Sequence, residues 1–74
     1  MSFSEVYKHL LQKRKKVTYR SLISNNTYSV HCTLPPHIKK QAVSDKIVVW
    51  DIDKNKSMDI EINTIERVED CPFQ

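Results

Sequence analysis

The chain of 74 residues contains no glycine, and this absence restricts both its turns and its chemistry. Tight turns must then use Asn, Asp, Ser or Pro, because glycine is the residue that enters the positive-φ region without steric cost. Glycine-rich phosphate loops are excluded as well. The sequence therefore argues against P-loop nucleotide-binding proteins and against dinucleotide-binding folds.

Long hydrophobic runs and paired cysteine motifs are also missing. No run of about 18 apolar residues is present, so no membrane-spanning helix and no membrane partner are expected. The N-terminus, MSFSEVYKHL, has no basic segment followed by an apolar one, which argues against a secretory signal. Cys32 and Cys71 are far apart without C-x-x-C spacing, which favours two free thiols in a cytoplasmic protein.

Length and charge describe a small bipolar domain. A chain of 74 residues corresponds to a single domain over 1–74, too small for a deep substrate cavity. The net charge is +3, but residues 1–46 carry +7 and residues 47–74 carry −4. Such an asymmetry is typical of a molecule with one basic and one acidic surface.

The hydrophobic pattern predicts one helix followed by about five strands. Ser2 and Glu5 have the spacing of a capping box, and an apolar stripe follows at helical intervals, so a helix is expected from Phe3 to Gln12 or Arg14. Strands are expected over 17–23, 27–34, 47–51, 58–62 and 66–69, with a tight turn at 25–26, a connection over 37–45 and a 3₁₀ turn over 63–65. The predicted organisation is helix and basic cluster over 1–15, barrel over 16–70 and a loose tail over 71–74.

The segment VVWDIDKNKSMDIEINTIERVE resembles the C-terminal part of WYL domains and of their short phage relatives. The shared features are the Trp50-Asp51 pair at the end of a strand and the closing pattern of Ile62, Ile65 and Val68. With the element order, the resemblance implies a mainly β (α+β) fold: a small SH3/Sm-like antiparallel barrel of about five strands with an N-terminal amphipathic helix. It also implies a phage-encoded accessory protein that acts in the host cytoplasm during host takeover.

A basic cluster provides the leading functional hypothesis. Cations gathered at the end of the helix and the start of the first strand are suited to phosphate contacts, which are independent of sequence and sensitive to salt. The sequence therefore predicts a non-enzymatic module that binds RNA or DNA; the alternative is a solvated cluster that only caps the helix. The candidate nucleic-acid-binding residues are Lys8, Lys13, Arg14, Lys15, Lys16, Arg20, Lys39 and Lys40.

An acidic strand provides the second hypothesis. WYL-type sequences often carry Arg or Lys after the polar turn, where this chain has Asp59 and Glu61. A host protein is then the predicted partner, bound through an acidic face that mimics nucleic acid or through an open barrel edge. The candidate protein-binding residues are Asp51, Asp53, Asp59 and Glu61. A nucleotide-sensing WYL-like pocket is a third possibility, which those acids weaken.

Metal-binding and catalytic patterns are incomplete. DIDKNKSMDIE places oxygen ligands at the odd positions of a calcium loop, but Lys56 stands where that loop needs glycine and Ile62 where it needs glutamate. The histidines and cysteines lack zinc-site spacing, and no nucleophile has a recognisable base partner. No metal, cofactor or catalytic residue is therefore expected, and the oligomeric state remains open.

Overall fold

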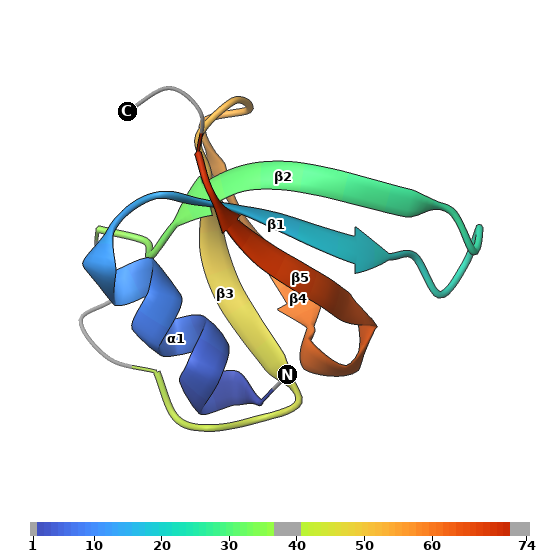
Figure 1. The fold of residues 1–74 in the computed structure, drawn as a ribbon, viewed down its shortest axis with the longest axis horizontal. Helices are drawn as coiled ribbons and strands as arrows, with labels where there is room; N and C mark the ends of the chain where they lie inside the picture. The colour runs from blue at the N-terminus through green and yellow to red at the C-terminus, as the bar shows by residue number, and fades with distance from the viewer. Residues whose placement is uncertain (1, 37–40, 72–74) are drawn as a thin grey trace.

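One helix and five strands form the protein in the computed structural model, which describes residues 2–36 and 41–71 (Figure 1). The elements are α1 (Phe3–Gln12), β1 (Lys15–Arg20), β2 (Thr27–Thr33), β3 (Lys46–Asp51), β4 (Lys56–Glu61), the 3₁₀ turn η1 (Ile62–Thr64) and β5 (Ile65–Asp70). All strand pairs are antiparallel, in the order β4-β3-β2-β1-β5. The predicted α+β class, with an N-terminal helix and a five-stranded antiparallel sheet, is confirmed.

The helix begins and ends where the sequence predicts. The Ser2 hydroxyl accepts a hydrogen bond from the Glu5 N–H (3.3 Å), and the Glu5 carboxylate accepts one from the Ser2 N–H (3.2 Å). The hydrogen bonds that the Ser2 N–H and hydroxyl donate to the Glu5 carboxylate lower the pKa of Glu5. The backbone leaves the helix at Lys13, which is fully extended. Phe3, Val6 and Leu10 form the buried stripe, so α1 is held to the sheet by its apolar face.

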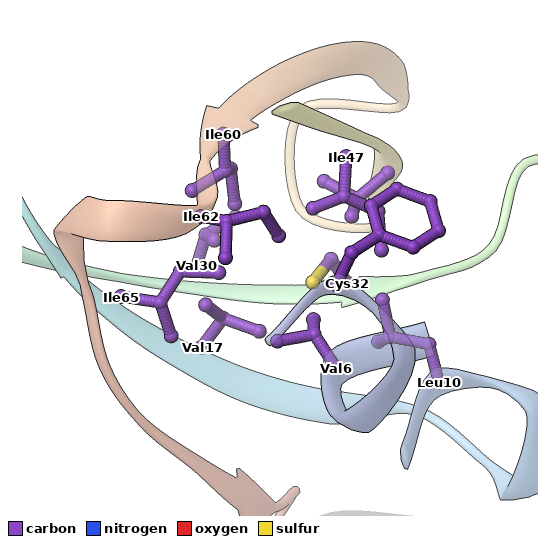
Figure 2. Packing of buried hydrophobic residues seen from close by; sticks show 11 residues of the cluster. Val6, Leu10, Val17, Val30, Cys32, Ile47, Ile60, Ile62 and Ile65 are labelled. Carbon is purple, nitrogen blue, oxygen red and sulfur yellow. The ribbon is translucent and has the colours of Figure 1, made fainter. Parts of the chain in front are cut away.

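The core lies between α1 and the inner face of the sheet (Figure 2). Val6 and Leu10 of the helix point toward Cys32 and Ile47, which come from the neighbouring strands β2 and β3. Burial of each such aliphatic side chain contributes about 1.5–3 kcal/mol. The buried cluster contains Phe3, Val6, Leu10, Val17, Val30, Cys32, Ile47, Val49, Ile60, Ile62 and Ile65.

The β1–β2 hairpin has a longer turn than the sequence predicts. β1 ends at Arg20, so the expectation that it runs to Ile23 is wrong for its last three residues. The turn is closed by the Ser21 N–H, which donates to the Asn26 carbonyl (2.8 Å), and Asn25 adopts a positive φ of 60°. Without glycine, a two-residue turn with both residues at positive φ is costly. A wider turn with only one left-handed residue, at the predicted Asn-Asn pair, avoids that cost.

The β2–β3 pairing is short, and a side chain extends it. Only two residue pairs, Cys32 with Asp51 and Thr33 with Trp50, link these strands. Beyond them, the Gln41 amide takes the place of a neighbouring strand: its Nε2 donates to the Val48 carbonyl (2.8 Å) and its Oε1 accepts from the Val48 N–H (2.9 Å). The first part of the predicted connection over 37–45 falls on residues 37–40, outside the described residues.

The remaining boundaries differ from expectation by one or two residues. β4 begins at Lys56 instead of Met58, and the 3₁₀ turn occupies 62–64 instead of 63–65. The expectation of a loose tail is wrong at its first residue, because Cys71 is 5% exposed. Its side chain packs at the end of β5, while residues 72–74 lie outside the described part.

Candidate functional site

The basic cluster at the end of the helix is partly engaged in internal ion pairs. The Lys15 side chain is only 7% exposed and donates a hydrogen bond to the Asp70 carboxylate, and the Lys13 ammonium lies 3.6 Å from the same carboxylate. The hydrogen bond from Lys15, helped by the charge of Lys13, lowers the pKa of Asp70. Two of the eight candidate cations therefore share one acid.

The other candidate cations are divided among separate elements. Arg20 forms an ion pair with Glu66 on β5, at 3.1 Å. Lys8 and Arg14 are exposed and Lys16 is half-buried, and none of these three has an ion pair within the described residues. Lys39 and Lys40 lie outside the described residues. The structure thus leaves three described cations for a nucleic-acid surface.

The acidic candidates also separate into two groups. Asp51 is buried at 4% exposed, and its carboxylate accepts a hydrogen bond from the Lys54 N–H (3.0 Å), which closes the β3–β4 turn. Asp53 pairs with the His31 ring nitrogen at 3.2 Å. Asp59 is exposed, and Glu61 is half-exposed beside Lys46 at 3.7 Å. Only Asp59 and Glu61 therefore form an acidic surface on β4.

A hollow lies between the turn of the β1–β2 hairpin and β4. Its volume is about 330 Å³. The hairpin side supplies Tyr19, Leu22 and Ile23, and the strand side supplies residues 59–61. A smaller hollow of about 170 Å³ shares Tyr19 and extends toward Tyr28 and Met58. We call these two hollows, which share Tyr19 in their lining, the hairpin groove.

The turn of the hairpin presents large apolar side chains to solvent. Leu22 is 76% exposed and Ile23 is 99% exposed, and Tyr28 beside them is 45% exposed. Tyr19 and Tyr28 are neighbours, with ring centroids 6.0 Å apart. The Tyr28 hydroxyl lies 3.2 Å from the Ser24 hydroxyl, and this hydrogen bond lowers the pKa of Tyr28. These adjacent exposed apolar residues make the hairpin turn a candidate interaction surface.

Sequence reasoning missed this groove because Leu22 and Ile23 fit the end of a strand. A signal for it was present: Ser21-Leu22-Ile23-Ser24 directly precedes an Asn-Asn turn, so two apolar residues stand among turn-forming residues. Such residues are hard to bury in a turn. Their position therefore indicates a surface role.

A second apolar hollow, of about 450 Å³, lies between α1 and the segment that carries Gln41 and Val43. It is lined by Phe3, Tyr7, Leu11 and Val43, with Lys8 at its margin. Leu11 and Val43 are exposed at 60% and 74%. It adjoins residues that are not described, so the hairpin groove, whose lining is described throughout, is the better defined candidate site.

The two cysteines are poor nucleophiles. Burial raises the pKa of the Cys32 thiol to about 12, and it also raises the pKa of Cys71. Over residues 2–36 and 41–71, no three His, Cys, Asp or Glu side chains gather where a metal ion would fit. Within the same residues, no helix has the length and apolar character to cross a membrane.

The fold and the groove together define a small α+β protein with an open apolar groove between a projecting hairpin and an acidic edge strand. Comparison with family models, with curated proteins and with solved structures gave no match to this chain.

Proposed function

We propose that this chain is a non-catalytic binding module whose partner is another protein. The observation that carries the proposal is the pair of exposed residues Leu22 and Ile23 at the hairpin groove, beside the exposed acid of Asp59. Exposed apolar anchors next to a polar rim are the usual composition of a protein-binding surface. The acidic side chains of β4, Asp59 and Glu61, attract basic groups and repel phosphate.

The burial of Lys15 adds to this choice. A phosphate contact needs an accessible cation, whereas the Lys15 ammonium is buried and already holds Asp70. Lys13 and Arg20 are also matched by carboxylates of β5. Three of the candidate cations therefore neutralise carboxylates of the neighbouring strand β5.

Affinity capture from cell lysate, with and without nuclease, tests the proposal. The tagged full chain is compared with Leu22→Ser/Ile23→Ser and with the matched control Leu11→Ser/Val43→Ser, which removes two exposed apolar residues at the other hollow. We expect one protein to be recovered in stoichiometric amount, nuclease-resistant, retained by the control and lost from the hairpin variant. Recovery that depends on nucleic acid, or that both variants lose equally, contradicts the proposal.

Nucleic-acid binding is the second candidate, favoured by the exposed Lys8 and Arg14 and by the half-buried Lys16. Three phosphate contacts give a shallow salt dependence, with a slope of log affinity against log salt of about −3. Fluorescence anisotropy with labelled RNA and DNA oligonucleotides at several salt concentrations measures that slope. Binding that falls with salt and disappears in Lys8→Glu/Arg14→Glu supports this candidate over the first.

A further inference from the structure

We propose that the partner binds as an extended peptide segment that adds a strand to the free edge of β4, with basic and apolar side chains in alternation. This inference rests on the proposed protein-binding function and names the site and the chemistry of the segment. Three features carry it: an open backbone edge, a two-faced strand, and an apolar hollow beside that edge.

The edge of β4 is open because, among the described strands, it pairs only with β3. Val48 directs its N–H and C=O to the Gln41 side chain and thus away from β4. Asp59, which lies opposite Val48, is then in a non-hydrogen-bonded pair, so its backbone groups also point away from β3. Ser57 and Glu61, two residues away, have the same orientation. The Glu61 carbonyl accepts from the Thr64 hydroxyl (2.7 Å), which leaves Ser57 and Asp59 as the open positions.

The two faces of β4 specify the side chains of the added strand. Ile60 is buried in the core and Met58 is half-buried on the same inner face, whereas Ser57, Asp59 and Glu61 alternate with them on the outer face. Residues directly opposite in neighbouring strands share a face, and opposite charges there attract. The added strand therefore carries basic side chains beside Asp59 and Glu61 and apolar side chains between them.

The hairpin groove has room for the apolar side chains. Asp59, Ile60 and Glu61 form one wall of the larger hollow, and Leu22 and Ile23 form the other. This space exists because β2 and β3 pair over only two residues, so the turn end of the hairpin projects away from the sheet (Figure 1). An inserted segment would cover the exposed apolar tip and pair the open edge in one step.

Charge complementarity favours a basic peptide over a nucleic acid as the occupant. The charges on the outer face of β4, Asp59 and Glu61, are acidic, and Glu61 is only partly matched by Lys46 at 3.7 Å. A phosphate backbone placed there would meet like charge. A peptide with alternating lysines gains attraction on one face and apolar burial on the other.

The probe is a blocked hexapeptide that alternates lysine and valine, titrated into the ¹⁵N-labelled full chain and followed by amide chemical shifts. We expect shifts concentrated at Ser57, Asp59, Tyr19 and Leu22. A glutamate–valine hexapeptide of the same length should bind at least about tenfold more weakly, because both cross-strand charge pairs become repulsive. A lysine–valine peptide with a central proline should also lose binding, since it cannot donate to the strand edge.

Charge-reversal variants test whether the peptide binds at β4 itself or is attracted by the acidic half of the molecule in general. Asp59→Lys/Glu61→Lys should weaken the lysine–valine peptide by about tenfold or more. The control Glu69→Lys reverses an exposed acid of β5 that lines neither hollow of the hairpin groove, and it should leave the affinity within about twofold. Unchanged spectra confirm the fold of each variant away from the substitutions.

Three results overturn the inference: no shifts with the lysine–valine peptide, shifts that map outside β4 and the hairpin groove, or equal weakening by both charge reversals. A native mass of twice the chain, with β4 amides protected in the dimer, also overturns it, because a second copy is then the occupant. If lysate capture succeeds and depends on Leu22 and Ile23 while the peptide fails, the proposed function stands and only this inference falls. If the peptide binds at β4 but no protein is captured, the proposed function fails.

Discussion

The β1–β2 hairpin differs sharply between its two ends. At its base, Val17 and Val30 are buried within the core beneath α1, and β5 pairs with β1 alongside. At its turn, Leu22 and Ile23 stand in solvent, and β2 has parted from β3 (Figure 1). The base of the hairpin supplies stability and the turn supplies accessible apolar surface. One continuous hairpin thus belongs both to the core and to the candidate site.

The charges follow the same division. The charge of Lys15, near the packed base, is buried and matched by Asp70. Asp59, beside the hairpin turn, is exposed and has no ion pair within the described residues. A charge matched inside the fold is not available to a partner. The free charge of Asp59 beside the hairpin turn is therefore acidic, although the whole chain is basic.

The largest expected contrast comes from one substitution made in both regions. Ile47→Ala removes a side chain that is fully buried between the helix and the sheet, and should lower the free energy of unfolding by about 3 kcal/mol. Ile23→Ala at the exposed turn should change it by less than about 0.5 kcal/mol. Urea denaturation followed by tryptophan fluorescence measures both.

If Ile47→Ala unfolds the chain outright, Ile47→Val replaces it, with an expected loss of about 1 kcal/mol. A loss at Ile23 as large as that at Ile47 would mean that the turn belongs to the core, and the comparison between the two ends would be wrong.

A smaller effect is expected where β2 and β3 part. Gln41→Met keeps the length of the side chain but removes both hydrogen bonds to the Val48 backbone, and should cost about 1–2 kcal/mol. Gln12→Met, the same substitution at an exposed helical position, should be close to neutral. Chemical denaturation and amide exchange at Val48 test this. Equal stability of the two variants would show that β3 does not need this substitute for a strand.

Much of the fold was predictable because local rules and packing agree along most of the chain. The capping box at Ser2 and Glu5 fixed the start of α1, and the apolar stripe gave its buried face. Alternation located β2 almost to the residue, and the Asn-Asn pair located the left-handed position of its turn. In each case the signal lies within a few residues, so no knowledge of distant partners was required.

The candidate site was less predictable because it depends on contacts between distant residues. Lys15 looks like part of a surface cluster, yet Asp70, 55 residues away, pairs with it across β1 and β5. Asp51 looks like an exposed acid before a polar turn, but its carboxylate turns inward to the Lys54 N–H. Leu22 and Ile23 look like strand residues until the turn widens. Charge and hydropathy along a sequence do not say which partner a side chain meets.

A modest dependence of stability on pH is expected from Asp70, which pairs with Lys15 near the base of the hairpin. Because Lys15 and Lys13 lower the pKa of Asp70, the unfolded chain, with its ordinary pKa of 3.8, binds the proton first as pH falls. The contribution of Asp70 to stability is therefore complete above that value and is lost as pH falls through the lower folded pKa.

The stability of Asp70→Asn should fall less steeply with decreasing pH than that of the wild type. Thermal unfolding between about pH 2 and pH 6 measures this difference. Lys15→Met should flatten the same curve, because it breaks the same pair. A wild-type decline retained in both variants would contradict this assignment; Glu5 leaves some decline in each.

The smallest expected effect is at the hairpin turn, where the Ser24 hydroxyl forms a hydrogen bond with the Tyr28 hydroxyl. Because hydrogen bonds from Ser24 and Asn26 lower the pKa of Tyr28, Ser24→Ala should raise it part of the way to the ordinary value of 10.0. Titration of the tyrosine ring carbons by NMR, with Tyr28→Phe to assign the resonance and Ser44→Ala as a control in another loop, measures the shift. An unchanged Tyr28 pKa would show that this bond is not formed in solution. A rise would show that this bond is formed in the free chain, so this part of the hairpin turn is already ordered before a partner arrives, which lowers the ordering cost of binding.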